Sequence, residues 1–290
     1  MIELPVIEQP RTTPRRPEWL KVRAPGGEDY ARVKTMMRSK ALHTVCEEAR
    51  CPNITECWNA GTATFMIHGD TCTRSCGFCA VKTGRPLGVD LDEPLRVAQA
   101  IASMKLKHVV ITSVDRDELK DGGSEIWAET IRQVRVHAPN TTLEVLIPDF
   151  KANMTNAHRV FAERPDILSH NTETVPRLYK HVRPQGRYQW AQQILTESKN
   201  AGLRTKTGVM VGLGETKEEI FAVMADAASI GVDVFTIGQY LQPTKNHLPV
   251  DRFVHPDEFA EYKERGESMG IGHVESGPLV RSSYHAERHI

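Results

Sequence analysis

Strand-like and helix-like segments alternate along most of this chain, and that alternation restricts its fold more than any other feature. Short apolar runs that favour buried strands lie at residues 63–67, 108–112, 143–147, 167–169, 205–211 and 232–237. Segments with helical spacing of apolar residues follow at 94–104, 123–137, 154–162, 188–201, 217–230 and 256–269. Successive β–α units of this kind imply a parallel sheet with right-handed crossovers, either a doubly wound sheet or a (β/α) barrel.

Polar residues directly after the predicted strands favour the barrel. They are Ser113, Asp115 and Arg116 after the second strand, Asn171 and Glu173 after the fourth, Gly212, Gly214 and Glu215 after the fifth, and Gln239 and Tyr240 after the sixth. Barrel active sites are built from the loops at the carboxyl ends of the strands, where all of these residues lie. We therefore expect an α/β protein, a partial (β/α)6 TIM-type barrel with its chemistry at the mouth.

Three parts are expected along the chain. Residues 1–61 form an N-terminal extension, in which an irregular arm with five prolines covers about 1–30 and a short helix covers 30–42. Residues 62–275 form the barrel, and residues 276–290 form a C-terminal tail. We expect the extension and the tail to cap the barrel mouth.

All six cysteines of the 290-residue chain fall into two triplets. The triplets are Cys46, Cys51 and Cys57, and Cys72, Cys76 and Cys79. A group of three cannot pair internally without leaving one thiol over, so it makes a poor disulfide framework. Thiolates are soft ligands for zinc, copper(I) or iron-sulfur clusters, and they persist in a reducing compartment. The N-terminal segment lacks the apolar stretch of a signal peptide, so we expect a cytoplasmic protein.

The charge balance excludes some classes of partner. Lys and Arg total 37, Asp and Glu also total 37, and the net charge is zero. A chain-wide basic field for nucleic acid is therefore absent, and no run approaches the ~20 apolar residues of a membrane span. We expect neither a nucleic-acid partner nor a membrane.

The spacing of the second triplet, Cys-x3-Cys-x2-Cys, suits a 4Fe-4S cluster with one open corner. Three thiolates can hold three irons, and no fourth cysteine lies close by in the sequence. An open iron can bind a substrate or cofactor, as a catalytic zinc does at its protein-free position. The alternative is a zinc site completed by a histidine such as His68 or His43, although zinc more often uses Cys-x2-Cys pairs.

This spacing, with Phe78 just before the last cysteine, resembles the signature of radical S-adenosylmethionine enzymes. The resemblance implies that Cys72, Cys76 and Cys79 hold a 4Fe-4S cluster whose open iron chelates S-adenosylmethionine. In that family, reductive cleavage of the cofactor gives methionine and a 5′-deoxyadenosyl radical, which removes hydrogen from unactivated C–H bonds.

Further segments resemble lipoyl synthases, at 51–57, 114–117, 121–123, 170–174, 208–215 and 281–286. The resemblance implies an auxiliary 4Fe-4S cluster on Cys46, Cys51 and Cys57, with Ser283 as its fourth ligand. Ligand counting agrees, because two such clusters have eight corners, six cysteines fill six, and S-adenosylmethionine takes one more. Without the resemblance, Ser282 and Ser283 would be expected in a solvated tail.

The resemblance also implies a reaction and its partners. Lipoyl synthases are sulfurtransferases of lipoate biosynthesis that insert sulfur at C6 and C8 of an octanoyl chain on a lysine of a carrier domain. The auxiliary cluster is the implied sulfur donor. The carrier would be a 2-oxoacid dehydrogenase E2 subunit or the glycine cleavage H protein, and the electron donor a ferredoxin or flavodoxin. Both carbons are unactivated, so acid–base chemistry cannot replace the cofactor's radical.

The cofactor-binding residues that the resemblance implies are Phe78, Asn171, Glu173, Arg183, Gly212 and Glu215. Phe78 is expected at the adenine, with a place in the core as the alternative. A carboxylate partner suits the fork of Arg183, with a surface salt bridge as the alternative. The turn at Gly212 is expected to approach the adenosyl group, with Glu215 as the N-cap of the next helix.

Two other functions stay open at the level of the sequence. Another radical S-adenosylmethionine enzyme, one that inserts sulfur or transfers a methylthio group, would need a different auxiliary arrangement, and nucleic-acid targets would require a basic binding module. A two-cluster electron-transfer protein would usually be short and would complete each cluster with four cysteines.

Overall fold

The structure is a computed structural model that describes residues 15–21, 26, 34–35, 37, 42–48, 51, 53–59 and 61–289. The irregular arm predicted over 1–30 and the helix predicted over 30–42 fall largely outside these residues. A short 3-10 helix, η1 (Glu18–Leu20), is described within the arm. Every helix in the described part of the chain is too short or too polar to span a bilayer.

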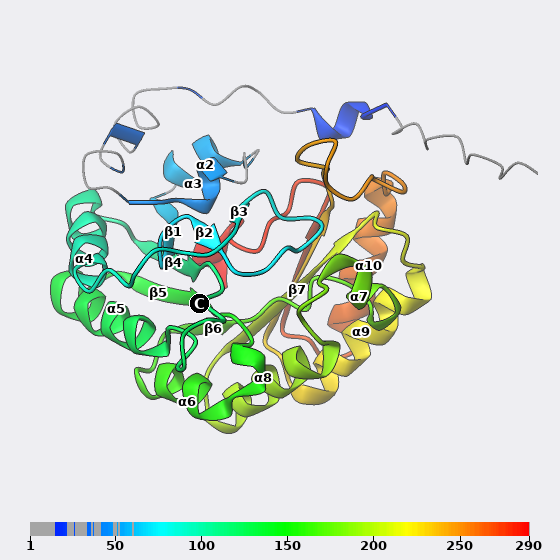
Figure 1. Cartoon of the computed structure of the whole chain (residues 1–290). Coiled ribbons are helices and arrows are strands. Elements are labelled where there is room, and N and C mark those ends of the chain that lie inside the picture. Colours follow the sequence, from blue (N-terminus) through cyan, green and yellow to red (C-terminus); the bar gives the residue numbers. More distant parts are fainter. Residues whose placement is uncertain are drawn as a thin grey trace, which may run out of the picture.

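Seven parallel strands form one curved sheet in the order in which they occur along the chain (Figure 1). They are β1 (Thr62–Ile67), β4 (His108–Ser113), β5 (Thr142–Leu146), β6 (Ile167–Ser169), β7 (Thr205–Val211), β8 (Val234–Gln239) and β9 (His273–Gly277). Each strand pairs with the next, from Thr62 opposite His108 to Val234 opposite His273. No pairing between β1 and β9 occurs among the described residues. The sheet is therefore a partial barrel that is open between its first and last strands.

Six helices cover the outside of this sheet (Figure 1). They are α4 (Glu93–Met104), α5 (Ser124–His137), α6 (Met154–Ala162), α8 (Tyr188–Asn200), α9 (Lys217–Ile230) and α10 (Pro256–Ser268). All six predicted helices and all six predicted strands are confirmed to within two residues at either end. The seventh strand, β9, was not predicted, because its sequence HVESG has few apolar residues and only one buried side chain.

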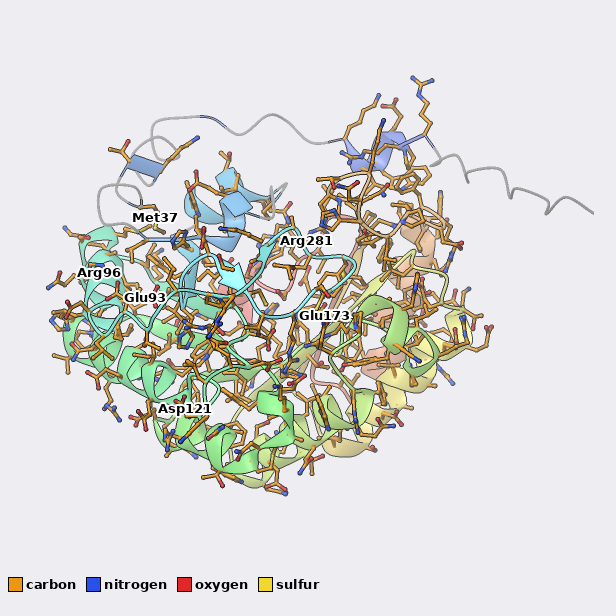
Figure 2. The ribbon with its side chains drawn as sticks, viewed as in Figure 1. Met37, Glu93, Arg96, Asp121, Glu173 and Arg281 are labelled. Carbon is orange, nitrogen blue, oxygen red and sulfur yellow. The ribbon has the colours of Figure 1, made fainter. Side chains whose placement is uncertain are left out.

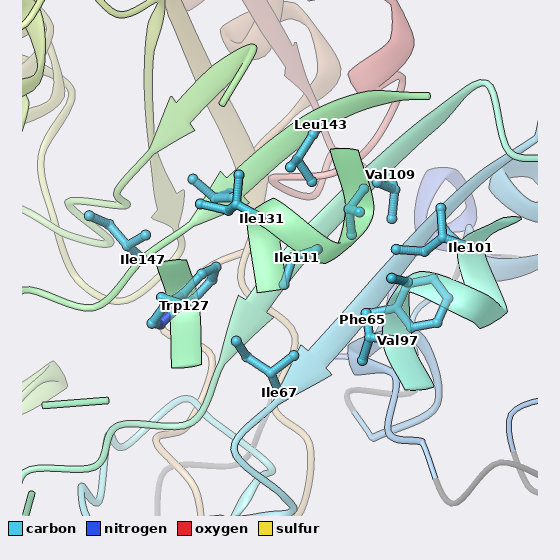
Figure 3. Close-up of a cluster of buried hydrophobic side chains, with 14 of the residues drawn as sticks. Phe65, Ile67, Val97, Ile101, Val109, Ile111, Trp127, Ile131, Leu143 and Ile147 are labelled. Carbon is cyan, nitrogen blue, oxygen red and sulfur yellow. The ribbon is translucent and has the colours of Figure 1, made fainter. Parts of the chain in front are cut away.

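The strands read as continuous apolar runs because helices cover their outer face and side chains fill the barrel on the other. All six residues of β1 are buried. In Figure 3, Phe65, Val109 and Leu143 from three strands pack beneath side chains of α4 and α5, which include the fully buried Trp127. Parallel sheets with both faces covered have this pattern. Truncating such an aromatic residue to alanine typically costs about 3 to 5 kcal/mol.

Short elements lie beside β1 and after the carboxyl ends of several strands. Two helices, α2 (Val45–Glu48) and α3 (Ile54–Asn59), lie against β1. Two short paired strands, β2 (Thr71–Cys72) and β3 (Lys82–Thr83), follow it. A turn labelled η2 (Phe150–Ala152) follows β5, and η3 (Pro176–Leu178) with α7 (Tyr179–Val182) follow β6.

The C-terminal segment runs past the mouth and ends inside the barrel, where Figure 1 marks the C-terminus. Near the mouth, the carbonyl oxygen of Val280 lies so close to Gly238 of β8 that a Cβ there would be 2.1 Å from it. Further on, Glu287 accepts a hydrogen bond from Thr62, the first residue of β1. The segment thus crosses from the mouth to the opposite end, which the sequence did not predict.

Candidate metal centres

The second cysteine triplet lies on the loop after β1, at the carboxyl end of the sheet. Cys72 ends β2, and its sulfur accepts hydrogen bonds from the backbone N–H groups of Arg74 at 3.4 Å and Asp115 at 3.3 Å. Hydrogen bonds to sulfur are one of the means by which proteins tune iron-sulfur clusters. Two such donors suit a thiolate that is bound to a metal.

The thiols of this triplet lose their protons readily only if the group that they bind is positively charged. Burial raises the pKa of Cys76 to about 12 and that of Cys79 to about 11. Arg183 opposes the effect of burial on Cys76, but does not reverse it. Only the thiolate is a metal ligand, so binding must release these protons. A cationic metal cluster meets this requirement.

The cysteine loop is fixed by loops from two other strands. The N–H of Gly77 donates to the carbonyl of Val182 in α7, and the N–H of Leu248, beyond β8, donates to the carbonyl of Gly77, each at 2.9 Å. A Cβ at Gly77 would lie 2.8 Å from the side chain of Leu248. The ring of His247 lies 2.9 Å from the carbonyl oxygen of Cys79. The loop is therefore held in one position on the mouth.

Arg74, between the first two cysteines of this triplet, is a central residue that the sequence analysis missed. Its side chain is buried and donates to Asp149 at 2.7 and 2.6 Å and to Asp117 at 2.8 and 2.9 Å. Its Nε also lies 3.3 Å from Asp115. Burial alone would raise the pKa of Asp149, but the hydrogen bonds from Arg74 lower it to about 2. The sequence did contain a signal for this role of Arg74: a cationic residue in the cysteine loop, and acidic residues after two of the predicted strands.

Asn171, Glu173 and Arg183 come together beside this triplet. Arg183 is only 7% exposed, donates to the carbonyl of Asn171 at 3.1 Å, and lies 3.7 Å from Asp149. A surface salt bridge, the alternative for Arg183, is therefore wrong. Glu173 has a left-handed φ of 71° and bridges to β7. Burial raises the pKa of Glu173, and the charge of Arg183 nearby opposes this rise. Strained backbone of this kind clusters at functional sites.

Phe78 and Gly212 are also at the mouth. Phe78 is partly exposed, so a place in the hydrophobic core, its alternative, is wrong. Gly212 has a φ of 95°, and a Cβ there would lie 2.2 Å from Gln239 and 2.5 Å from the carbonyl of Arg252. Only glycine fits this turn without strain.

Glu215 is not the N-cap of α9, so this part of the prediction is wrong. Its carboxylate accepts hydrogen bonds from the N–H groups of Gly212 at 2.6 Å and Leu213 at 2.9 Å, and so closes the turn after β7. The N-cap is Thr216, which forms a reciprocal capping box with Glu219. The Thr-x-x-Glu pattern was visible in the sequence and should have decided the assignment.

The first triplet lies on and between α2 and α3. Cys46 is buried in α2, Cys57 is in α3, and the N–H of Cys51 donates to the carbonyl of Cys46 at 3.0 Å. Burial and the neighbouring Cys46 raise the pKa of Cys51 to about 11, and the charge of Arg281 opposes them. Burial also raises the pKa of Cys57. Like those of the second triplet, these thiols should become thiolates more readily on a cationic metal cluster than without one.

The C-terminal segment passes beside the first triplet. The amide of Asn53 donates to the carbonyl of Leu279 at 2.7 Å, and the hydroxyl of Tyr284 donates to Glu56 at 3.2 Å. In Figure 2, Arg281 lies toward the middle of the molecule, as Glu173 does. Ser283 therefore belongs to a segment that is attached on one side of it to Asn53, just before α3, and on the other side to Glu56 in α3.

The histidines suggested for a zinc site have other surroundings. The ring of His68 lies 3.1 Å from the carbonyl of Gly123, and burial lowers its pKa to about 4. His43 joins a β-bridge to Met66 through its backbone. Nothing in these contacts directs either ring at the second triplet.

Comparisons with known proteins agree with the arrangement of the two triplets. The sequence profile of the radical SAM superfamily matches residues 66–227, and that of the N-terminal domain of lipoyl synthase matches residues 5–51. A lipoyl synthase of Rubrobacter xylanophilus is 58% identical over 97% of this chain and 88% of its own length. One of Flavobacterium johnsoniae is 55% identical over 96% of each chain. A mitochondrial lipoyl synthase of Nematostella vectensis is 54% identical over 95% of each.

Solved structures of lower similarity share the fold. The hydrogenase maturase HydG has a TM-score of 0.59 and 15% identity over 73% of this chain and 50% of its own. Methylornithine synthase has a TM-score of 0.53 and 12% identity over 78% and 67%. The superfamily profile, the N-terminal profile and the relatives together cover both triplets and the barrel. The chain therefore belongs to the lipoyl synthase family of the radical SAM superfamily.

Proposed function

We propose that this enzyme inserts sulfur at C6 and C8 of an octanoyl-lysine on a carrier domain, with S-adenosylmethionine and two 4Fe-4S clusters as its reagents. The names of its relatives support the reaction. The observation that carries the division of roles is the attachment of the C-terminal segment to α3, beside Cys57. It supports the assignment of a non-cysteine ligand from this segment to the first triplet.

At the second triplet, Cys72, Cys76 and Cys79 would hold a cluster that leaves one iron open to S-adenosylmethionine. When bound, this cluster and cofactor supply the radical that removes hydrogen from an unactivated carbon. The protein binds and orients the cofactor and shields it from solvent. The residues proposed to contact the cofactor are Phe78, Asn171, Glu173, Arg183, Gly212 and Glu215.

Arg183 and Glu173 match the two charges of an amino acid. The methionine part of the cofactor carries a carboxylate and an ammonium group, which suit a guanidinium and a carboxylate respectively. Arg183 is buried, so its interactions are screened less than those of a surface charge. Gly212 lets this turn pack closely against Gln239 and Arg252, and Glu215 keeps the turn closed, so the turn offers its backbone to the ligand in one conformation.

At the first triplet, Ser283 is proposed as the fourth ligand of the auxiliary cluster. A serine alkoxide is harder than a thiolate and is expected to be the weaker corner in iron-sulfur chemistry. Ser283 would hold the most readily released iron of a cluster that serves as the sulfur donor. The charge of Arg281 opposes the rise that burial causes in the pKa of Cys51, which favours the thiolate needed for ligation here.

The remaining parts of the proposal concern surroundings and partners. The carrier is a 2-oxoacid dehydrogenase E2 subunit or a glycine cleavage H protein, and the electron donor is a ferredoxin or flavodoxin. A cytoplasmic location suits six free thiols, which need reducing conditions. The division proposed is 1–61, 62–275 and 276–290, with the last barrel strand, β9, running two residues past the second boundary. Neither methylthio transfer nor electron transfer alone is supported by the relatives.

The experiment compares Ser283→Ala with the matched control Ser282→Ala. Each variant is reconstituted anaerobically and assayed with S-adenosylmethionine, a reductant and an octanoyl-lysine peptide. Ser283→Ala should still cleave the cofactor but form no thiolated product, whereas Ser282→Ala should do both. Normal product formation by Ser283→Ala would contradict the assignment, and loss of both reactions in the two variants would mean that the segment has only a structural role.

A further inference from the structure

A fully buried group of ionisable side chains lies at the end of the barrel opposite the mouth. It consists of His108 on β4, Glu144 on β5, Lys206 on β7 and His289 in the C-terminal segment, each 0% exposed. The ammonium of Lys206 lies 2.9 Å from Glu144 and 3.0 Å from Nδ1 of His289. The ring of His108 lies 3.8 Å from Glu144. We call these four residues the base cluster.

The protonation of the base cluster follows from its charges. Burial alone would raise the pKa of Glu144, but the charge of Lys206 lowers it to about 2, so this carboxylate is ionised. Burial and the charge of Lys206 lower the pKa of His289 to about 3, so this ring is neutral. An ammonium group only donates, and Nδ1 of His289 therefore accepts while its proton is on Nε2.

This protonation argues against a metal at the same place. Ligand atoms of His273, Glu275 and His289 lie within 4.8 Å of one another, which is a plausible spacing for a cation. However, Nε2 of His289 carries its proton and Nδ1 faces an ammonium group. A metal ligand needs a free lone pair and tolerates a nearby cation poorly. The contacts of His289 are better explained as hydrogen bonds that hold the segment.

The base cluster is connected to the region of Ser283 by a short run of chain with further attachments. Arg204 donates to the carbonyl of His289 at 2.6 Å, and Thr62 donates to Glu287 at 3.1 Å. Ala286 is fully buried. Within this segment Tyr284 and Arg288 make local turns, with backbone hydrogen bonds of 2.9 and 2.8 Å. The segment is therefore attached at the base, at β1 and at α3.

We propose that the base cluster is an anchor: by accepting a hydrogen bond from Lys206, His289 fixes the C-terminal segment inside the barrel and so positions Ser283 at the first triplet. The inference rests on the proposed ligation by Ser283. A buried polar group such as the ammonium of Lys206 strongly favours satisfied hydrogen bonds, so the anchor has one preferred position. His289 acts through the chain and is a positioning residue.

The test uses the full-length protein with both clusters in place, kept anaerobic. Amide hydrogen exchange is followed over 281–288, and iron release to a chelator is followed at the first cluster. His289→Ala should speed exchange in this segment about tenfold or more, since local opening then costs less, and leave β7 and β8 unchanged. It should also speed iron release at the first cluster, with S-adenosylmethionine cleavage at the second unchanged.

Three further variants make the result specific. His289→Gln keeps an acceptor for Lys206 and should restore both rates. Arg204→Gln removes only the bond to the His289 carbonyl and should shift both rates in the same direction, so the anchor stays testable if His289→Ala fails to fold. His158→Ala, on a half-exposed histidine paired with Glu197, should change neither rate.

Unchanged exchange over 281–288 in both His289→Ala and Arg204→Gln would overturn the anchor. Faster exchange with unchanged iron release would overturn the positioning of Ser283. Slower exchange over 281–288 on adding Zn²⁺ to the wild-type protein would show instead that His289 binds a metal ion. If Ser283→Ala itself leaves iron release unchanged, the proposed serine ligand fails, while the exchange rates still decide whether His289 holds the segment.

Discussion

The guanidinium of Arg74 donates to both carboxylate oxygens of Asp149, at 2.7 and 2.6 Å, and this pair joins the cysteine loop to the carboxyl end of β5. Asp149 also lies 3.7 Å from Arg183. The buried carboxylate of Asp149 therefore connects the loop of the second triplet to Arg183, which is proposed to hold the cofactor. The arrangement depends on the planar fork of arginine, which an ammonium group cannot reproduce.

Arg74→Lys should destabilise the protein and its second cluster. The charge stays, but two of the acids lose donors in a buried site, and breaking such a network typically costs about 3 kcal/mol or more. Urea unfolding and iron retention at the second triplet measure the effect. The matched control is Arg132→Lys, whose contacts with Glu129 and Glu163 are half-exposed and should cost at most about 1 kcal/mol. Equal effects of the two substitutions would contradict this role for Arg74.

His68 should make the protein less stable as the pH falls. Its pKa is about 4 in the folded protein, below its ordinary value of 6.5, because the ring is buried. The unfolded state then binds more protons between these values, so stability is lost as the pH falls from 6.5 toward 4. At pH 5.5 the loss is about 1 kcal/mol relative to pH 7.5.

His68→Asn should remove that part of the pH dependence. Asparagine tolerates the left-handed φ of 70° at this position, so the backbone is preserved. Denaturant unfolding at pH 7.5 and 5.5 gives the comparison, with His158→Asn as an exposed control. A slope identical to that of the wild type would show that His68 does not titrate as its burial implies.

Lys151→Gly should stabilise the protein. Phe150, Lys151 and Ala152 all have left-handed φ angles, of 46°, 53° and 59°. A left-handed conformation costs a side-chain-bearing residue about 1 to 2 kcal/mol, and glycine avoids most of this at an entropic cost of its own. We expect a net gain of up to about 1 kcal/mol in urea unfolding. Lys263→Gly, inside α10, should instead lower the free energy of unfolding. A lower free energy of unfolding in both variants would refute the strain argument.

Gly238→Ala should disturb the first cluster and spare the second. A Cβ on Gly238 would lie 2.1 Å from the carbonyl oxygen of Val280, so the C-terminal segment has to move. Iron release from the first cluster should quicken, whereas cleavage of S-adenosylmethionine should persist. Gly88→Ala, where a Cβ meets nothing within 4 Å, is the control. Intact first-cluster iron in Gly238→Ala would mean that the segment does not hold that cluster.

The sequence predicted those features that depend on local pattern. Apolar periodicity located the strands and helices of the barrel, and the polar residues after β4, β6 and β7 do lie at its mouth. β9 was missed because its strand, HVESG, is half polar and only Val274 is buried. Glu215 was misplaced because a helix start was assigned by charge and not by the capping box of the next residue.

Contacts between distant parts of the chain could not be predicted in the same way. Arg74 and Asp149 are 75 residues apart, and no local period connects them. The same holds for Lys206 and His289, which meet only because the C-terminal segment enters the barrel. The roles of the two triplets came from spacing and family resemblance, whereas the segment's path came only from the fold.

The most direct test counts iron in two triple variants, one with Cys46, Cys51 and Cys57 changed to alanine and one with Cys72, Cys76 and Cys79 changed to alanine. The wild type should bind about eight irons and each variant about four, since each triplet is assigned one 4Fe-4S cluster. Only the variant that keeps Cys72, Cys76 and Cys79 should cleave S-adenosylmethionine, and neither should form thiolated product. About four irons in the wild type, or cofactor cleavage by the variant that keeps only Cys46, Cys51 and Cys57, would contradict the account.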